Sequence, residues 1–283
     1  MKTISTISEV RSAVQSIRSK HKSVGFVPTM GYLHEGHLHL IRKAKKVCDS
    51  VVVSIFVNPT QFAPGEDFAK YPRDIERDTA LAKAAGADVL FVPSVEEMYP
   101  KDFSAFVIVE GLSSVLEGVF RPSHFDGVTT IVNKLFNIVQ ADKVFFGQKD
   151  AQQCAVVKKM VKDLQMPVEI EIVPTVREVD GLAMSSRNIY LNADERKNAS
   201  VLYQALQYAD EKIKEGEKDV PKIVAAMKRM IQSKNPSAID YIAIVDSETL
   251  QPKNKLAKGD SLLIPLAVRF GTTRLIDNIT VRL

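Results

Sequence analysis

The sequence contains no long hydrophobic run. None of its apolar stretches approaches the ~20 residues that a helix needs to cross a bilayer, so we expect no membrane span and no membrane partner. The first residues, MKTISTISEVRSAV, lack the apolar core of a signal peptide. We therefore expect a cytoplasmic protein.

Cysteine and net charge are also scarce. Only Cys48 and Cys154 are present, both in apolar-periodic helical stretches, which predicts two reduced, half-buried thiols rather than a disulfide framework. The net charge of +4 is small and spread along the chain, so we expect no nucleic-acid partner. A slight basic excess suits an anionic small substrate without requiring one.

The sequence offers no obvious catalytic nucleophile. It has no G-x-S-x-G motif, and neither cysteine lies in a convincingly basic neighbourhood. We therefore expect catalysis by positioning and charge stabilisation.

What the sequence does have is an alternation of strand-like and helix-like stretches. With 45% hydrophobic and 25% charged residues, it matches an ordinary globular protein. Short β-branched runs predict strands at 24–27, 50–57, 88–93, 143–146 and 168–173. Helices are predicted at 7–21, 38–47, 75–85 and 128–139, and the turn 147–150 leads into a further helix that runs to Leu164. This order predicts an α/β fold with a Rossmann-like, doubly wound parallel sheet.

The pattern changes after Thr175. Two helical stretches, at 194–214 and 220–233, come first. Three strand-like runs follow, at 239–245, 261–269 and 272–276. We expect a first domain over 1–175 and a smaller α+β domain over 176–283.

Two stretches do not fit the alternation. Residues 63–74 form a long polar loop at a strand end, which suits either a lid over a site or a plain surface loop. Residues 105–109 predict an additional strand, and the run 104–110 is our candidate for a dimer surface.

The stretch FVPTMGYLHEGHLH, residues 26–39, has the order strand, tight turn, helix. A helix start carries about half a positive charge and unpaired N–H donors, which favour phosphate. His34 and His37 are three residues apart and share one face of the helix. We therefore interpret the stretch as an anion site, although two partly exposed histidines at a helix start are a plain structural alternative.

Of two other interpretations of this stretch, a P-loop is rejected and a zinc site is kept only as a minor alternative. Gly31 and Gly36 have the spacing of a phosphate-binding P-loop, but His37 and Leu38 replace the required Lys and Ser/Thr. A zinc site through His34 and His37 lacks the H-E-x-x-H spacing and a third ligand.

Further polar clusters follow predicted strand ends, where α/β proteins bind ligands: 58–61 and 147–153, with 184–187 at the domain junction. Lys149 and Arg187 supply fixed cations, and Gln61 and Gln153 suit hydroxyl groups. Asp88 is either a turn residue or a distant magnesium anchor.

Several of these stretches together resemble one family. His34-Glu35-Gly36-His37 resembles the H-x-G-H motif of adenylyl-transferring enzymes, and Met184-Ser185-Ser186-Arg187 resembles a shortened K-M-S-K-S loop. PTMGYLHEGH, SIFVNPTQF, YPRD, FFGQKDAQQ and DGLAMSSRN, in this order, resemble the pantothenate synthetase (pantoate–β-alanine ligase) family. Many relatives have Glu at Gln148 and some have Tyr at Ala151, and neither difference touches Lys149 or Asp150.

The resemblance implies a reaction and its partners. It implies ATP-dependent ligation of pantoate and β-alanine to pantothenate, a coenzyme A precursor, through pantoyl adenylate with release of AMP and pyrophosphate. It also implies a cytoplasmic homodimer that requires Mg²⁺, with ATP bound between the two domains.

The resemblance also assigns residues. It implies that His37, His34 and Lys149 are catalytic and that Gln61 and Gln153 hold pantoate. The implied ATP-binding residues are Met30, Gly31, Tyr32, Leu33, His34, Glu35, Gly36, His37, Gly147, Gln148, Lys149, Asp150, Val176, Met184, Ser185, Ser186 and Arg187. It assigns no metal ligand.

Three rival functions share part of this pattern. A nucleotidyltransferase acting on a phosphorylated acceptor would need cations where Gln61 and Gln153 lie. A fragment of an aminoacyl-tRNA synthetase would need a basic RNA-binding face. A nucleotide-binding sensor would keep the phosphate site and lack substrate coupling.

Overall fold

The computed structural model describes residues 1–283, which form two compact units. The first unit consists of Met1–Ser114, Arg121–Gly147 and Gln153–Pro174. The second consists of Val115–Phe120, Gln148–Gln152 and Thr175–Leu283, so it includes two short segments from the first 175 residues. Each unit is described by itself.

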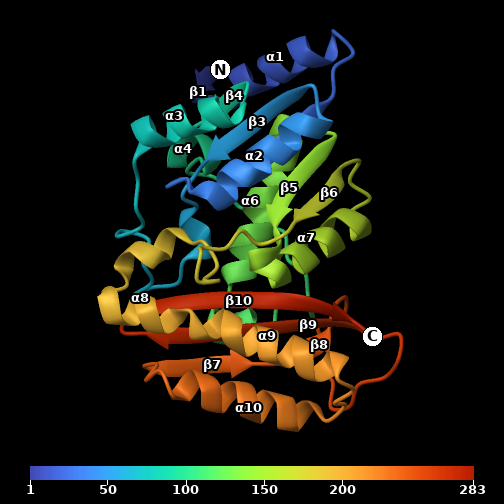
Figure 1. Ribbon diagram of the computed structural model, residues 1–283. Coiled ribbons are helices and arrows are strands. Elements are labelled where there is room, and N and C mark those ends of the chain that lie inside the picture. The colour runs from blue at the N-terminus through green and yellow to red at the C-terminus, as the bar shows by residue number, and fades with distance from the viewer. The chain divides into compact units, whose positions relative to one another are not determined.

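The first unit is built on a six-stranded parallel sheet (Figure 1). Its strands are β1 (Lys2–Ile4), β2 (Val24–Thr29), β3 (Ser50–Ile55), β4 (Val89–Phe91), β5 (Lys143–Gly147) and β6 (Glu169–Val173), in the order β1-β4-β3-β2-β5-β6. After β2, the chain adds β3 and then β4 on one side of β2, and later adds β5 and then β6 on the other side. The carboxyl ends of β2 and β5 therefore flank the point where strand order reverses, the usual ligand position in such sheets.

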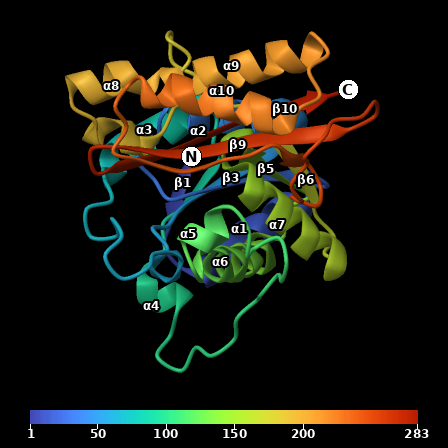
Figure 2. The same ribbon diagram turned by 90° about the horizontal axis from the view of Figure 1, so that it is seen from below.

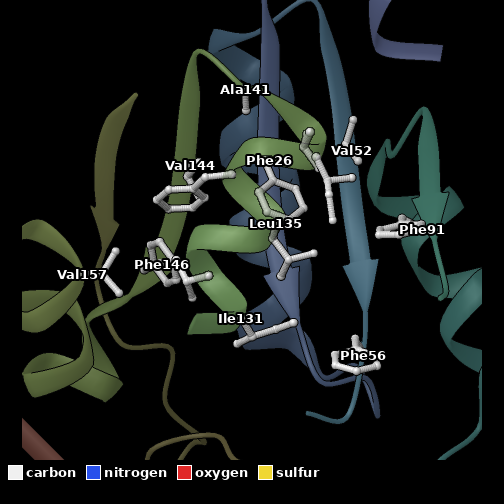
Figure 3. Packing of buried hydrophobic residues seen from close by; sticks show 14 of the residues in the cluster. Phe26, Val52, Phe56, Phe91, Ile131, Leu135, Ala141, Val144, Phe146 and Val157 are labelled. Atoms are coloured by element: carbon white, nitrogen blue, oxygen red, sulfur yellow. The ribbon is translucent and has the colours of Figure 1, made fainter. Parts of the chain in front are cut away.

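Helices cover both faces of this sheet. The helices α1 (Ile7–Arg18), α6 (His124–Val139) and α7 (Ala151–Asp163) contribute to one core cluster, and α2 (Glu35–Val47) and α3 (Ile75–Ala85) to the other. Figure 3 shows Ile131 and Leu135 of α6 close to Phe26 of β2. Buried on both faces, Val51–Val53 has the continuous apolar run expected of an inner parallel strand. The predicted doubly wound fold is confirmed.

The second unit contains an antiparallel sheet covered by helices. Its helices are α8 (Ala193–Ala199), α9 (Val201–Lys214) and α10 (Val220–Gln232), and its strands are β7 (Ala238–Ile242), β8 (Val245–Asp246), β9 (Ser261–Phe270) and β10 (Thr273–Arg282). The order is β10-β9-β7, with β8 paired to β9. Both ribbon views show α9 and α10 on one face of this sheet (Figures 1 and 2). The smaller α+β part of the fold is therefore also confirmed.

Five short helical segments complete the structure. They are the α-helical turns α4 (Val95–Met98) and α5 (Glu117–Phe120) and the 3-10 turns η1 (Pro59–Gln61), η2 (Gln148–Asp150) and η3 (Ser186–Tyr190). No helix of the protein combines the length and the apolar character that a membrane crossing requires.

The strand predicted at residues 105–109 is wrong, because this segment pairs with no strand. The N–H of Val107 donates to Oγ1 of Thr130 at 3.0 Å, and its carbonyl accepts from Oγ1 of Thr129. Two threonines of α6 thus satisfy the backbone groups that a neighbouring strand would otherwise bind.

Two other expectations are sharpened. Cys48 and Cys154 are free thiols, and both are buried rather than half-buried.

Asp88 lies at the amino ends of β3 and β4, where its carboxylate accepts from the N–H of Val51 and from Lys45 Nζ, both at 2.8 Å. Asp88 therefore organises the edge of the sheet opposite the carboxyl ends.

Candidate functional site

The turn between β2 and α2 is held in place by a buried carboxylate. Gly31 and Tyr32 have positive φ angles of 85° and 49°, and a Cβ at Gly31 would lie 2.8 Å from Cγ2 of Ile55. The carboxylate of Asp78, on α3, accepts from the N–H of Tyr32 at 2.6 Å and from that of Leu33 at 2.7 Å. The turn that precedes the two histidines is therefore fixed from a second helix.

Asp78 was not among the predicted site residues. Its side chain is only 1% exposed, and burial raises the pKa of this carboxyl although the N–H groups of Leu33 and Tyr32 oppose the change. An acidic residue in the first turn of a helix looks like an ordinary helix-start residue. Its partners lie more than 40 positions earlier in the chain, so local patterns do not reveal them.

His34 and His37 form a reciprocal cap at the start of α2. Nδ1 of His34 accepts from the N–H of Gly36 at 3.1 Å, and Nδ1 of His37 accepts from the N–H of His34 at 3.3 Å. The ring centroids are 4.0 Å apart. Because Nδ1 accepts in both neutral rings, the proton of each must be on Nε2. Both side chains thus have a defined tautomer, with a donor on the ring edge away from the backbone.

Gln61 follows β3 in η1, and a second amide orients its side chain. Asn58, 1% exposed, donates from Nδ2 to Oε1 of Gln61 and to the carbonyl of Gly127, both at 3.1 Å. Nε2 of Gln61 lies 3.0 Å from Sδ of Met30. The structure therefore brings a residue predicted for the nucleotide next to one predicted for pantoate.

The backbone around Gln61 is held by the start of α6. Its carbonyl lies 2.8 Å from Nδ1 of His124 and accepts from Arg121 at 3.3 Å. A Cβ on Gly127 would meet the carbonyl of Thr60 and, at 2.6 Å, the N–H nitrogen of Gln61. These supporting residues were not predicted from the sequence. The need for glycine at 127, for example, comes from its close approach to the backbone of Thr60 and Gln61, which only the structure shows.

The predicted lid, residues 63–74, is an ordered loop without strands or α-helices. Arg121 forms a two-point ion pair with Glu66, with N–O distances of 2.7 and 2.8 Å. Phe62 packs on Phe68 and Tyr71 with centroid distances of 5.4 and 6.0 Å. The loop has its own aromatic cluster and a half-buried ion pair with Arg121, and lid motion stays a prediction.

In the second unit, η2 carries Lys149, whose side chain is 19% exposed. Nζ of Lys149 lies 3.6 Å from Oδ1 of Asp150. The side chain of Asn278 on β10 donates to the carbonyls of Gln148 and Lys149 at 3.0 and 2.9 Å. The main chain that carries Lys149 is therefore attached to the last strand of the sheet.

A tight hairpin in the second unit presents Met184–Arg187. The N–H of Met184 donates to the carbonyl of Val176 at 3.0 Å, so these two predicted nucleotide residues are neighbours. Oγ of Ser185 caps η3 by accepting from the N–H of Arg187 at 3.2 Å. Gly181, at the turn, has a φ of 91°, and any Cβ there would run into the ring of Tyr203.

Arg196 braces this hairpin from α8. It pairs with Glu178 at 2.7 Å and with Asp180 at 2.6 Å. The hydrogen bond to Asp180 is the main cause that raises the pKa of Arg196. A pair of carboxylates and one guanidinium thus fix the turn from which Met184–Arg187 emerges.

The predicted residues are divided between the two units. Met30 of the Met30–His37 stretch contacts Gln61 in the first unit, and Gln148–Asp150, Val176 and Met184–Arg187 lie in the second. Gln153 is half-buried on α7. Its neighbour Gln152 is buried and structural, since it accepts from the N–H of Glu117 at 3.0 Å.

Neither group contains a ready-made cation site. No cluster of three or more His, Cys, Asp and Glu side chains in the protein could hold a metal ion. What the site residues offer is a helix start, two Nε2 donors and fixed cations, which suit anionic ligands.

Comparison with known proteins identifies the family. The family model described as pantoate-beta-alanine ligase matches residues 2–280. The chain belongs to this family. It is 54% identical to a pantothenate synthetase from Acetivibrio thermocellus over 281 residues, 99% of each chain, and 54% identical to one from Moorella thermoacetica over 279 residues, 99% of this chain and 98% of the relative.

Solved structures of family members agree with the fold. The crystal structure of a pantothenate synthetase from Thermus thermophilus matches with a TM-score of 0.92 at 49% identity and covers 99% of each chain. A pantoate-beta-alanine ligase from Francisella tularensis, complexed with beta-gamma ATP and beta-alanine, matches with a TM-score of 0.82 at 35% identity. It covers 99% of this chain and 97% of that one.

Family membership confirms the function predicted from the motifs. The enzyme is a pantoate–β-alanine ligase, which forms a carbon–nitrogen bond at the expense of ATP through an acyl adenylate.

Proposed function

We propose that ATP is bound by the residues that the family resemblance assigns to it, Met30–His37, Gly147, Gln148–Asp150, Val176 and Met184–Arg187. The observation that carries this proposal is the tautomer of the histidine pair. With Nδ1 of His34 and His37 occupied by backbone N–H groups, each Nε2–H is a preorganised donor for phosphate oxygen.

The first step is adenylation of pantoate. A carboxylate oxygen of pantoate attacks the α-phosphorus of ATP, and the bond to the β-phosphate oxygen breaks to release pyrophosphate. Negative charge builds up on phosphate oxygens in this step. His34, His37 and Lys149 stabilise it, together with the N–H groups at the start of α2.

The acceptor is held by neutral amides. Gln61 and Gln153 bind the hydroxyl groups and carboxylate of pantoate, and Asn58 fixes the direction of the Gln61 amide. In the second step the amine of β-alanine attacks the activated carbonyl, AMP leaves with the shared oxygen, and the amine loses a proton. An amide bond results.

Mg²⁺ belongs to this proposal as a companion of ATP. It typically binds through substrate phosphates and only one or two carboxylates. When bound, it neutralises polyphosphate charge, and no separate protein cage is needed. We further propose a cytoplasmic homodimer, as the family resemblance implies.

Pantoate-dependent exchange of labelled pyrophosphate into ATP tests the proposal. We expect exchange that requires pantoate and does not require β-alanine. Exchange needs only the first step and its reversal, and β-alanine enters in the second step. Exchange without pantoate would indicate a different acceptor. No exchange with pantoate would contradict an adenylate intermediate.

A further inference from the structure

Two adjacent residues of β10, Asp277 and Asn278, hold separate parts of the second unit. Both side chains are buried, at 2% and 3% exposed. The amide of Asn278 donates to the carbonyls of Gln148 and Lys149 at 3.0 and 2.9 Å, and its oxygen accepts from Nε2 of Gln148 at 3.1 Å. Both the nitrogen and the oxygen of the Asn278 side chain therefore form hydrogen bonds with η2.

Asp277 binds the hairpin that carries Val176 and Met184. Its carboxylate accepts from Arg177 at 2.6 and 3.0 Å and from the N–H of Asn278 at 2.7 Å. Arg177 also donates to the carbonyls of Gly181 at 3.0 Å and Asn278 at 3.3 Å. Its guanidinium lies 3.9 Å from the ring centroid of Tyr203. The hairpin is therefore clamped to the same point of β10.

The segment carrying Lys149 depends on such external bonds. η2 is three residues long and leads directly into α7, so it is the end of a longer helical segment, and helix ends fray unless other groups hold them. Lys149 has a long, flexible side chain, so its ammonium is well placed only if its main chain is fixed.

We propose that Asp277 and Asn278 are positioning residues for adenylation, which couple the two cation-bearing segments, η2 with Lys149 and the hairpin leading to Arg187. Neither residue is assigned a substrate contact. The proposal rests on the proposed role of Lys149 in the first step. A misplacement of about 1 Å of a catalytic group can cost about 100-fold in rate.

The test is a double-mutant cycle of Asn278→Ala and Lys149→Ala in the full-length enzyme, measured by pantoate-dependent ATP–pyrophosphate exchange. We expect Asn278→Ala to lower kcat by about 10- to 100-fold, with KM for pantoate changed by less than about twofold. In the Lys149→Ala background, Asn278→Ala should cause little further loss, because the group through which it acts is already absent.

Asp219→Ala is the matched control. It removes one side-chain hydrogen bond of the second unit, the cap from Asp219 to the N–H of Lys222 on α10, far in sequence from either clamped segment. We expect a loss of thermal stability with kcat retained. If Asp219→Ala lowers kcat as much as Asn278→Ala, the effect is general destabilisation and the proposal is wrong.

Other outcomes separate this proposal from the function itself. Unchanged kcat in Asn278→Ala, or losses that multiply in the double variant, overturns the positioning role alone. Full activity of Lys149→Ala overturns the role of Lys149 and with it this inference. Absence of exchange in the wild-type enzyme instead contradicts the proposed function.

A second variant covers the case in which Asn278→Ala does not fold. Asn278→Asp keeps the size of the side chain and the acceptor for Gln148 but turns an oxygen toward two carbonyls. We expect faster amide hydrogen exchange at 148–152 together with lower kcat. Unchanged exchange and unchanged kcat would contradict the proposal.

Discussion

The imidazoles of His34 and His37 have two uses at the start of α2. Each Nδ1 accepts one of the backbone N–H groups that a helix start leaves unpaired. This contact also selects the tautomer and fixes the ring. A residue that usually serves as a proton switch is thereby made into an oriented donor.

Replacing His37 with alanine should separate these two uses. We expect adenylation to fall by about 100- to 1000-fold, the usual cost of removing one preorganised donor, while the protein still folds. His39→Ala is the control, because His39 is an exposed residue of the same helix. A near-normal rate of adenylate formation in His37→Ala would remove His37 from the mechanism.

Gly127 allows the loop that carries Gln61, the proposed pantoate-binding residue, to approach α6 closely. A methyl group at Gly127 would collide with the carbonyl of Thr60 and the N–H nitrogen of Gln61, so the loop must move. For Gly127→Ala we expect KM for pantoate to rise about 10-fold or more, with KM for ATP nearly unchanged. Exchange kinetics at varied pantoate and ATP measure both. Equal changes in the two constants would contradict a local effect on Gln61.

At the scale of elements, the loop 63–74 is anchored by one ion pair. Burial alone would raise the pKa of Glu66, but the hydrogen bonds and charge of Arg121 outweigh it and hold the pKa below its usual value of 4.5. A depressed carboxyl pKa contributes stability above 4.5, and this stability is lost as the pH falls through the folded-state pKa.

The pH dependence can be measured by comparing the wild type with Glu66→Gln at the same pH. At pH 7 we expect the variant to be less stable by about 1 kcal/mol, as for a partly buried pair. The difference should shrink as the pH falls below 4.5 and disappear once Glu66 is protonated in the folded state. Urea unfolding gives both free energies. A difference that does not change as the pH falls would show that charge is not the cause.

Sequence patterns predicted most helices and strands. Apolar residues recur about every 3.6 positions in a helix and every two positions in a strand when one face of the element is buried. The helix at 75–85 has the predicted bounds, ending at Gly86 with a φ of 101°. The failure at 105–109 has a different origin. A β-branched, apolar run suits a strand, but Thr129 and Thr130 bind its backbone, and only the fold brings them there.

At the scale of the whole molecule, the exposed part of that same run bears on assembly. Phe106 and Ile108 are each 61% exposed, unusual for side chains of this size. If residues 104–110 form the dimer surface, Phe106→Lys with Ile108→Glu should give monomers. Sedimentation at several concentrations measures the state. Dimers of unchanged stability would place the interface elsewhere, and monomers in the wild type would contradict the dimer itself.

The candidate site was predictable where its residues are consecutive. H-x-G-H, GQKD and MSSR can be recognised in the sequence as short polar runs that contain glycine or serine. The residues that hold these runs in place were not predictable. Asp78 and Asn278 are single polar residues whose partners lie up to 130 positions away. Their meaning depends on long-range contacts that no local spacing encodes.

The attachment of η2 to β10 has a consequence for how the protein is made. Translation proceeds at roughly 5–20 residues per second, so η2 emerges on the order of ten seconds before the strand that binds it. The same delay applies to α5, whose Glu117 pairs with Arg274 of β10 at 2.6 Å. A nascent chain can complete the six-stranded sheet with both histidines in place while Lys149 still has no fixed position. If Lys149 acts in adenylation as proposed, competence for chemistry is acquired late in biosynthesis, when the final hairpin forms.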